Sequence, residues 1–183
     1  MTRIIADISV SLDGFVTGPD PGPDNGLGTG GEALHTWVFS GDPDDRRVLR
    51  EATARSGAVV LGRRLFDVVD GPNGWNDEIG YGADEVGKPP FVVVTSSPPE
   101  SVRLTDLDWT FVTTGLSDAV LMGGGATVGS AVVAGLVDAL SLHLAPVVLG
   151  AGTPLFTGGA PRTLVQRTVL PTSTATHLTY EVV

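Results

Sequence analysis

Residues 121–135 read LMGGGATVGSAVVAG and place three consecutive glycines between an apolar run and a helical pattern. Glycine loses more backbone entropy on folding than alanine does, so a triplet at this junction indicates that something must come close to the backbone. We predict a buried strand over 119–125 and a helix over 126–137. Backbone N–H groups at the start of a helix bind anions, and glycines leave no β-carbon in the way, so this stretch favours a phosphate ligand.

The same order of strand and helix recurs on both sides of this stretch. We predict further strands over 3–12, 58–62, 91–97 and 139–150, helices over 32–39, 42–57 and 63–69, long loops over 18–31 and 70–90, and closing strands over 163–170 and 176–183. Buried strands that alternate with helices are typical of an α/β fold with a mainly parallel central sheet flanked by helices. The closing strands alternate with a period of two, which predicts an antiparallel C-terminal edge. A length of 183 residues suits a single domain over 1–183.

Composition narrows the class of protein. The chain is 42% hydrophobic and 17% charged, which indicates a folded domain. Its net charge of −10 argues against nucleic acid as a partner, because phosphates attract clustered Lys and Arg. The sequence has no cysteine, no signal-peptide pattern and no apolar run long enough for a membrane span, so we expect a cytoplasmic protein that acts on a small molecule. The three histidines lie far apart in the sequence, and no metal site is predicted.

Three of the predicted strands end in residues that suit an anion. These residues are Gly62, Arg63 and Arg64, then Thr95 and Ser96, and finally Gly123, Gly124 and Gly125. In an open α/β sheet, ligands bind outside the carboxyl ends of the strands, so the three ends together indicate a phosphorylated dinucleotide. Each also has an ordinary alternative: a tight turn for the glycines, a solvated face for the arginines and a simple strand exit for the hydroxyls. A G-x-G-x-x-G fingerprint does not fit, because Val128 stands where the third glycine should be.

Together these segments resemble the dihydrofolate reductase-like fold, and more closely the reductase domain of the riboflavin-biosynthesis deaminase-reductase. The resemblance covers nearly the whole chain and rests on SLDGFVTG after the first strand, VVLGRRLFD, VVVTSSPP, LMGGGATV and LVDALSLHLAPVVLGAGTPLF. It implies an NADPH-dependent reductase that forms a homodimer and transfers a hydride to a ribosylaminopyrimidine or a related heterocycle. The alternatives are reduction of dihydrofolate, a module that binds NADPH without catalysis, and a purely structural role for the glycines.

The resemblance also implies which residues hold the cofactor. The matching positions in this sequence are Val16, Thr17, Gly62, Arg63, Arg64, Thr95, Ser96, Gly123, Gly124, Gly125, Ala126, Thr127 and Val128. Residues 123–128 would cradle the pyrophosphate, Thr95 and Ser96 would lie beside the 2′-phosphate, and Val16 would lie near the nicotinamide. The family further suggests a cis peptide bond between the first two glycines, Gly123 and Gly124.

On the substrate side, Asp13 and Glu32 are the candidate catalytic residues. The resemblance places Asp13 in the pocket as a substrate contact, with turn formation as the alternative. Glu32 is the nearest match to the carboxylate that dihydrofolate reductases place early in the helix after the first long loop, with stabilisation of that helix end as the alternative. Trp75 is a candidate wall for a heterocycle, or a packing residue. Phe156 ends a P-x-x-x-G-x-G-x-x-x-F stretch, which the resemblance implies is the strand exit that closes the substrate side.

The sequence also departs from the family pattern. Leu65 stands where a threonine is usual, and Ala126 stands where dihydrofolate reductases often carry a basic residue. The lack of cysteine removes the zinc deaminase motif, so we expect the reductase activity without the deaminase.

Overall fold

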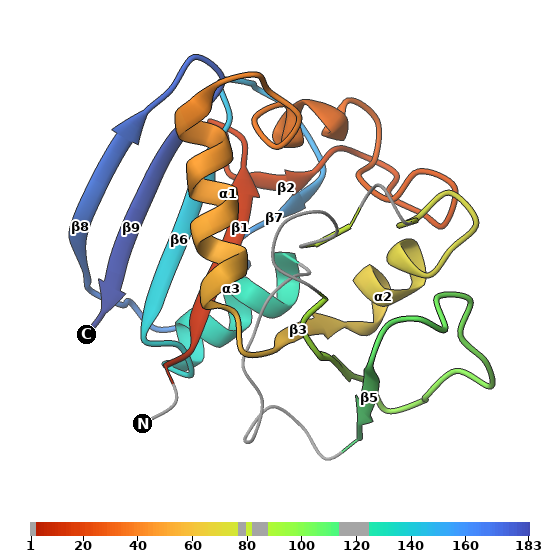
Figure 1. Cartoon of the computed structure of the whole chain (residues 1–183). Coiled ribbons are helices and arrows are strands. Elements are labelled where there is room, and N and C mark those ends of the chain that lie inside the picture. The colour runs from red at the N-terminus through yellow and green to blue at the C-terminus, as the bar shows by residue number, and fades with distance from the viewer. Residues whose placement is uncertain (1–2, 77–79, 82–87, 114–124) are drawn as a thin grey trace.

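The first and last strands of the chain lie in one sheet in the computed structural model, which describes residues 3–76, 80–81, 88–113 and 125–183 (Figure 1). The order of this sheet is β1 (Ile5–Val10), β6 (Ala139–Leu144), β9 (Thr176–Val182) and β8 (Leu164–Pro171). β1 and β6 run parallel, whereas β9 is antiparallel to both of its neighbours. The predicted antiparallel C-terminal edge is therefore confirmed.

A second sheet is parallel throughout. It consists of β3 (Val59–Gly62), β4 (Phe91–Val94) and β5 (Trp109–Val112), in that order. The sequence predicted β3 and β4 but not β5, in which Thr110 interrupts the kind of apolar run that marks the other two strands. Of the strand predicted over 119–125, all but Gly125 lies outside the described residues, and Gly125 begins the helix α3 (Gly125–Ala134).

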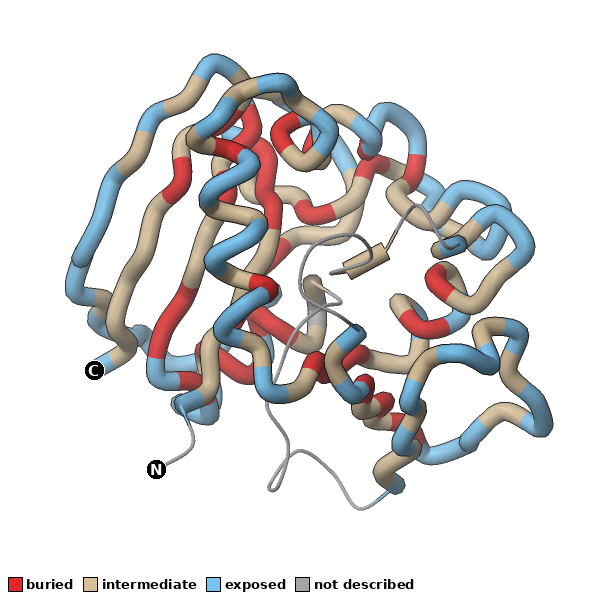
Figure 2. Tube along the Cα trace, in the orientation of Figure 1, coloured by how far each residue is buried: buried red, intermediate tan, exposed pale blue. Residues whose placement is uncertain are grey.

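The larger sheet has one apolar and one polar face, because successive side chains of a strand point to opposite sides. Ala6 and Val10 of β1 and Leu140 of β6 belong to the core cluster that also contains Val128 and Val132 of α3. The opposite face is covered by α1 (Pro43–Arg55), so that the two helices lie on the two sides of the sheet (Figure 1). Buried residues concentrate along β1, β6 and β3 (Figure 2).

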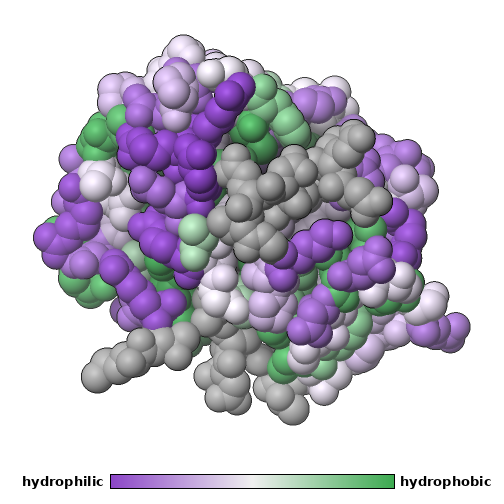
Figure 3. All heavy atoms as spheres, viewed as in Figure 1, coloured by the Kyte–Doolittle hydropathy of each residue, from purple (hydrophilic) through white to green (hydrophobic). Residues whose placement is uncertain are grey.

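The helix α1 begins where its sequence signals predict. The Asp42 carboxylate caps it by accepting the Asp44 backbone N–H at 2.9 Å, and Pro43 is the first helical residue. Its outward face is hydrophilic (Figure 3). Its buried residues are also polar, namely Asp45 and Thr53, because the sheet face beneath them is polar. The short helix α2 (Arg63–Val69) is likewise confirmed.

Three short elements differ from the prediction. In place of a helix over 32–39 the chain forms the 3-10 helix η1 (Gly31–His35), followed by turns. The strands β2 (Phe15–Thr17) and β7 (Thr153–Pro154) form an antiparallel pair that the sequence did not predict. Strands of two or three residues leave no periodic pattern to detect.

The long loop 18–31 closes on itself. The Gly18 N–H donates to the Leu27 carbonyl at 2.7 Å, and the Thr29 N–H donates to the Pro19 carbonyl at 2.8 Å. A β-carbon at Gly18 would lie 2.0 Å from the Thr29 carbonyl oxygen, so this crossing requires glycine. Within the described ranges, no helix is long and apolar enough to cross a membrane.

Candidate active site

The carboxyl ends of β3 and β4 lie side by side and carry two of the three predicted anion-binding ends. Gly62 is in register with Val94, so the residues that follow each strand are neighbours. The Arg63 side chain joins the two ends: its Nε donates to Asp67 Oδ1 at 2.7 Å, and its Nη1 donates to the Ser97 carbonyl. The structure therefore brings Gly62 and Arg63 together with the segment after β4, and it uses much of the Arg63 guanidinium to hold that arrangement.

Of the predicted donors at this edge, Arg64 and Ser96 are exposed. Arg64 makes no hydrogen bond or ion pair with another residue of the described ranges. Thr95 differs, because it is only 8% exposed and its hydroxyl both accepts the Ser97 N–H and donates to the Ser97 carbonyl, each at 3.1 Å. Thr95 thus shapes the turn, whereas Arg64 and Ser96 remain accessible to an anion.

At the glycine stretch, a side chain makes the close approach. A β-carbon at Gly125 would lie 1.9 Å from Cγ2 of Val16, so only glycine fits against β2 at this point. Val16 and Val128 are both buried in the main core, which leaves Val128 only its backbone to offer a cofactor. Gly123 and Gly124, with the cis bond predicted between them, lie outside the described residues.

The residues next to these fix the position of β2. Thr17 Oγ1 donates to Thr153 Oγ1 at 2.9 Å and accepts the Thr153 N–H at 3.1 Å, which ties β2 to β7. Thr127 is half-buried in the first turn of α3. Of Ala126 the structure describes the helical backbone alone. Val16 is therefore held between α3 and a strand pair that side-chain hydrogen bonds reinforce.

Asp13 is a structural anchor in this structure. Its Oδ1 accepts the Leu149 N–H at 3.1 Å and its Oδ2 accepts the Gly150 N–H at 2.7 Å, so it clamps the segment after β6. A hydrogen bond from Ser11, outweighing partial desolvation, together with these N–H groups lowers the pKa of Asp13 to about 2. The carboxylate is ionised at neutral pH. These contacts give Asp13 an anchoring role between distant segments that neither alternative described, and contact with substrate stays a prediction.

Glu32 lies exposed in the first turn of η1, and the structure gives it no buried partner among the described residues. His35 at the end of η1 is different, because its Nδ1 is buried and has no hydrogen-bond partner. Burial, with a smaller effect from His143, lowers the pKa of His35 to about 4. The His35 imidazole is therefore neutral at pH 7. For Glu32, a catalytic role stays a prediction.

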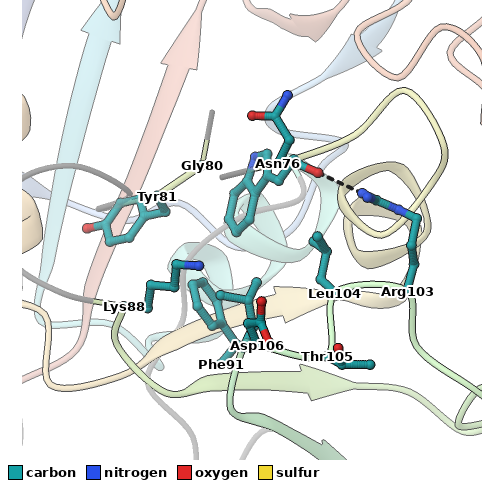
Figure 4. A pocket seen from close by; sticks show the side chains of 11 residues that line it. Asn76, Gly80, Tyr81, Lys88, Phe91, Arg103, Leu104, Thr105 and Asp106 are labelled. Carbon is teal, nitrogen blue, oxygen red and sulfur yellow. Dashed lines mark hydrogen bonds between the residues drawn. The ribbon is translucent and has the colours of Figure 1, made fainter. Parts of the chain in front are cut away.

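Trp75 lies at the opposite end of the second sheet from Gly62 and Thr95. It lines a pocket with Tyr81, Lys88 and Arg103 beside Phe91, the first residue of β4 (Figure 4). Its ring packs edge-to-face on Phe91 with centroids 5.6 Å apart, and Arg103 Nη2 donates to its carbonyl at 2.7 Å. The structure thus does not bring Trp75 to the predicted cofactor positions, and its contacts favour a packing role.

Phe156, the last predicted substrate residue, lies two residues after the end of β7 and is 46% exposed. Its neighbour Leu155 is 4% exposed and belongs to the main core. A β-carbon at Gly129 of α3 would lie 1.7 Å from the Leu155 carbonyl oxygen, so α3 and this segment are in close backbone contact. Phe156 is available to a ligand, and its role stays a prediction.

Sequence reasoning missed a buried polar cluster beneath α1. Asp7, His143, His177 and Asp45 are joined by hydrogen bonds, although they belong to β1, β6, β9 and α1. The two histidines lie directly opposite each other in the β6–β9 register. The available signal was a polar residue at alternate positions from Asp7 and Ser9 of β1 to Ser11, which directly follows the strand. The described residues hold no group of three or more His, Cys, Asp or Glu placed to bind a metal ion.

Comparison with known proteins identifies the family. The sequence profile of the RibD C-terminal domain matches residues 2–178. Among solved structures, a protein assigned to riboflavin biosynthesis from Shewanella sp. PV-4 is 21% identical, with a TM-score of 0.69 over 99% of both chains. Acinetobacter baumannii RibD is 15% identical, with a TM-score of 0.68 over 100% of this chain and 58% of its own. Comparison with curated proteins gives no match.

A Thermotoga maritima protein, a diaminohydroxyphosphoribosylaminopyrimidine deaminase/5-amino-6-(5-phosphoribosylamino)uracil reductase, is 15% identical, with a TM-score of 0.62 over 99% of this chain and 57% of its own. The chain thus spans just over half the length of the Acinetobacter and Thermotoga proteins. At these identities the likenesses show the fold, which is the dihydrofolate reductase-like fold expected from the sequence. Since the family profile spans nearly the whole sequence, the chain belongs to the RibD C-terminal domain family.

Proposed function

We propose that this protein is an NADPH-dependent reductase that transfers a hydride to a ribosylaminopyrimidine, as in 5-amino-6-(5-phosphoribosylamino)uracil reduction. The observation that carries the proposal is the edge of β3 and β4, where Arg64 and Ser96 are exposed beside the Arg63 bridge in a chain of the RibD C-terminal domain family. A guanidinium and a hydroxyl suit the 2′-phosphate that distinguishes NADPH from NADH.

The donors of this chain fit such a cofactor at two places. Arg64 and Ser96 would hold the 2′-phosphate, and the backbone at the start of α3, from Gly125 to Thr127, would face the pyrophosphate. When bound, NADPH supplies the hydride that reduces an aldehyde or imine carbon of a ring-opened ribosylamine. Val16 and Thr17, fixed against α3 and β7, would set the position of the nicotinamide.

The proton that accompanies the hydride needs a different residue from Asp13. Asp13 is ionised, with a pKa of about 2, so it serves as an acceptor that orients a substrate N–H or O–H. Glu32, exposed on η1, is the proposed proton carrier. The loop 18–31 would exclude water from this side of the site.

The test compares Arg64→Gln with Arg46→Gln, a matched loss of an exposed arginine on α1. Calorimetric titration should show one NADPH per chain in the wild type, with NADH binding more weakly. A hydrogen bond to a charged group contributes about 1.5–3 kcal/mol, so Arg64→Gln should weaken NADPH binding about tenfold or more and leave NADH unchanged. Arg46→Gln should change neither. Equal losses for both cofactors would remove the 2′-phosphate role.

Turnover separates the alternatives. Oxidation of NADPH with a ribosylaminopyrimidine, and its absence with dihydrofolate, would support the proposed reductase. Turnover of dihydrofolate instead would identify a dihydrofolate reductase, and binding without any turnover would identify an NADPH-binding module. Failure to bind either dinucleotide would leave the glycine at 125 as a packing residue alone.

We further propose that the protein is a homodimer and is located in the cytoplasm.

A further inference from the structure

Three buried side chains and one half-buried one form an unbroken series of hydrogen bonds beneath α1. Asp7 Oδ1 lies 3.0 Å from His143 Nε2, and His177 Nε2 lies 2.8 Å from Asp45 Oδ1. Between these pairs, the two Nδ1 atoms of His143 and His177 lie 2.7 Å apart. His143 and Asp45 are each 1% exposed and His177 is 5% exposed, whereas 17% of the Asp7 side chain is exposed. The chain therefore runs from a partly solvated carboxylate to a fully buried one.

The number of protons shared by these four side chains follows from the three contacts, or gaps, between them. Each gap joins two atoms that both carry lone pairs, so each requires one hydrogen between them. Two ionised carboxylates and two neutral imidazoles supply only two such hydrogens. The 2.7 Å contact between the Nδ1 atoms of His143 and His177 then needs a third, because two bare lone pairs repel at that distance. With three protons the chain has a net charge of −1, wherever each proton is located.

The surroundings fit one extra proton and not two. Burial acts to raise the pKa of Asp45, but hydrogen bonds that include the Ser40 and Thr174 hydroxyls, both 2.5 Å from its Oδ2, bring it to about 2. Asp45 is thus an ionised acceptor. Burial lowers the pKa of His177, and the charge of His143 adds to this against the effect of Asp45. One imidazolium therefore disfavours a second.

Other titratable groups also face the four hydrogen-bonded side chains. Burial acts to raise the pKa of Asp7, but the charge and the hydrogen bond of His143, with smaller effects from Ser141 and from Arg55 of α1, lower this pKa below its ordinary value. Asp7 in turn contributes to the raised pKa of Tyr81, about 12, which is mainly due to burial. Near the two central histidines, the charge of His143 adds to burial in lowering the pKa of His35. The Trp37 ring packs against the His143 ring with centroids 4.2 Å apart. Two carboxylates at its ends and an aromatic face over its centre all favour a cation between them.

We propose that His143 and His177 hold one shared proton at neutral pH, and that this proton docks α1 and the turn at 172–175 onto the sheet. Asp45 links all three parts, because it bonds His177 of β9, Thr174 of the turn and Ser40 ahead of α1. Loss of the proton would leave two lone pairs in contact and a charge of −2 in a buried site. The docking therefore weakens in alkaline solution, independently of the reductase proposal.

Nuclear magnetic resonance of the intact, ¹⁵N-histidine-labelled protein near neutral pH tests the proton count directly. The four ring nitrogens of His143 and His177 should hold three protons in total, one on each Nε2 and one that couples to both Nδ1 atoms. Only two protons on the four nitrogens, one on each ring, would overturn the proposal.

The pH dependence of unfolding gives a second test. A proton bound only in the folded state is lost as the pH rises through the folded pKa. Between the unfolded histidine pKa of about 6.5 and that folded pKa, the unfolding equilibrium constant increases about tenfold per pH unit. Between about pH 7 and about pH 9, below the titration of tyrosine and lysine, the wild type should show this increase. His177→Gln keeps a donor toward Asp45 but removes the facing Nδ1, so the increase should disappear.

His35→Gln is the matched control, because His35 has a folded pKa of about 4 and is neutral throughout this range. It should retain the alkaline increase of the wild type. A wild type with no alkaline increase, or a His177→Gln protein that retains it, would contradict the shared proton. If His177→Gln does not fold, the proton count in the wild-type spectrum still decides the question.

Discussion

At the scale of single residues, the contact between Gly125 and Val16 gives a sharp test of the packing. A methyl group at position 125 would lie 1.9 Å from Cγ2 of Val16. Gly125→Ala should therefore lower the free energy of unfolding by about 1–3 kcal/mol, the usual cost of overpacking a core. Urea unfolding measures this loss. Gly57→Ala is the control, because a β-carbon there would meet nothing within 4 Å.

The same contact predicts a rescue. Val16→Ala removes the methyl groups that the new β-carbon would strike. The double variant Val16→Ala with Gly125→Ala should therefore lose less free energy of unfolding than the two single variants lose together. Strict additivity would show that the cost of Gly125→Ala arises elsewhere.

Asp13 predicts a pH dependence at the acid end. Its folded pKa of about 2 lies below the ordinary carboxyl value of 3.8, so its contribution to stability is present above 3.8 and is lost as the pH falls toward 2. Asp13→Asn should lower the melting temperature at neutral pH and flatten the decline on acidification. Asp24→Asn, an exposed carboxylate of the loop 18–31, should leave the profile unchanged. An unaltered profile in Asp13→Asn, with a raised KM, would instead favour the substrate role.

At the scale of elements, the 3-10 helix η1 carries a second acid-sensitive group. The pKa of His35 falls from 6.5 to about 4 on folding, so between these values the unfolded chain binds a proton that the folded chain does not. Stability should consequently decline as the pH drops from about 6.5 to about 4. His35→Gln should remove this part of the decline in denaturant titrations at a series of pH values. A profile that keeps its slope would show that Nδ1 is hydrated or paired in solution.

Elements with local signals were predictable from the sequence. Asp42 and Pro43 begin α1, apolar runs mark β3 and β4, and a period of two marks the closing strands. The rule that parallel strands end at one edge also correctly brought Gly62 and Arg63 next to the segment of Thr95 and Ser96. These predictions succeeded because each depends on residues close in the sequence or on a general property of parallel sheets.

Contacts between distant segments were beyond the sequence. His143 and His177 meet only because β6 and β9 pair in one particular register, and Asp45 bonds His177 from a helix 132 residues earlier in the sequence. The position of Asp45 in the first turn of α1 indicates a negative charge at the positive end of that helix, but it gives no sign of these contacts. The prediction of a helix at Glu32 failed because η1 is too short and ends in turns.

At the scale of the whole molecule, β8 is an exposed edge that can pair with a second copy. Five consecutive residues of this strand are exposed, and Val169, 51% exposed, lies beside Leu178 of β9. Unpaired edge strands with apolar side chains favour association. If this edge forms the proposed homodimer, Val169→Lys should shift the protein from dimer to monomer in sedimentation velocity.

Val148→Lys provides the control for that experiment. Val148 is 68% exposed but follows β6, away from β8, so this substitution should leave the association unchanged. A wild type that sediments as a monomer at every concentration, or a Val169→Lys protein that remains dimeric, would exclude β8 as the interface.

The self-closed loop 18–31 also determines how the protein meets a protease. Cleavage requires an extended stretch of several residues in the protease cleft, and the hydrogen bonds from Gly18 to Leu27 and from Thr29 to Pro19 prevent this loop from extending locally. Cleavage within the loop would require both hydrogen bonds to break and Gly18 to separate from Thr29 at the same time. The fourteen residues should therefore survive limited digestion by a broad-specificity protease for as long as the strands on either side of them.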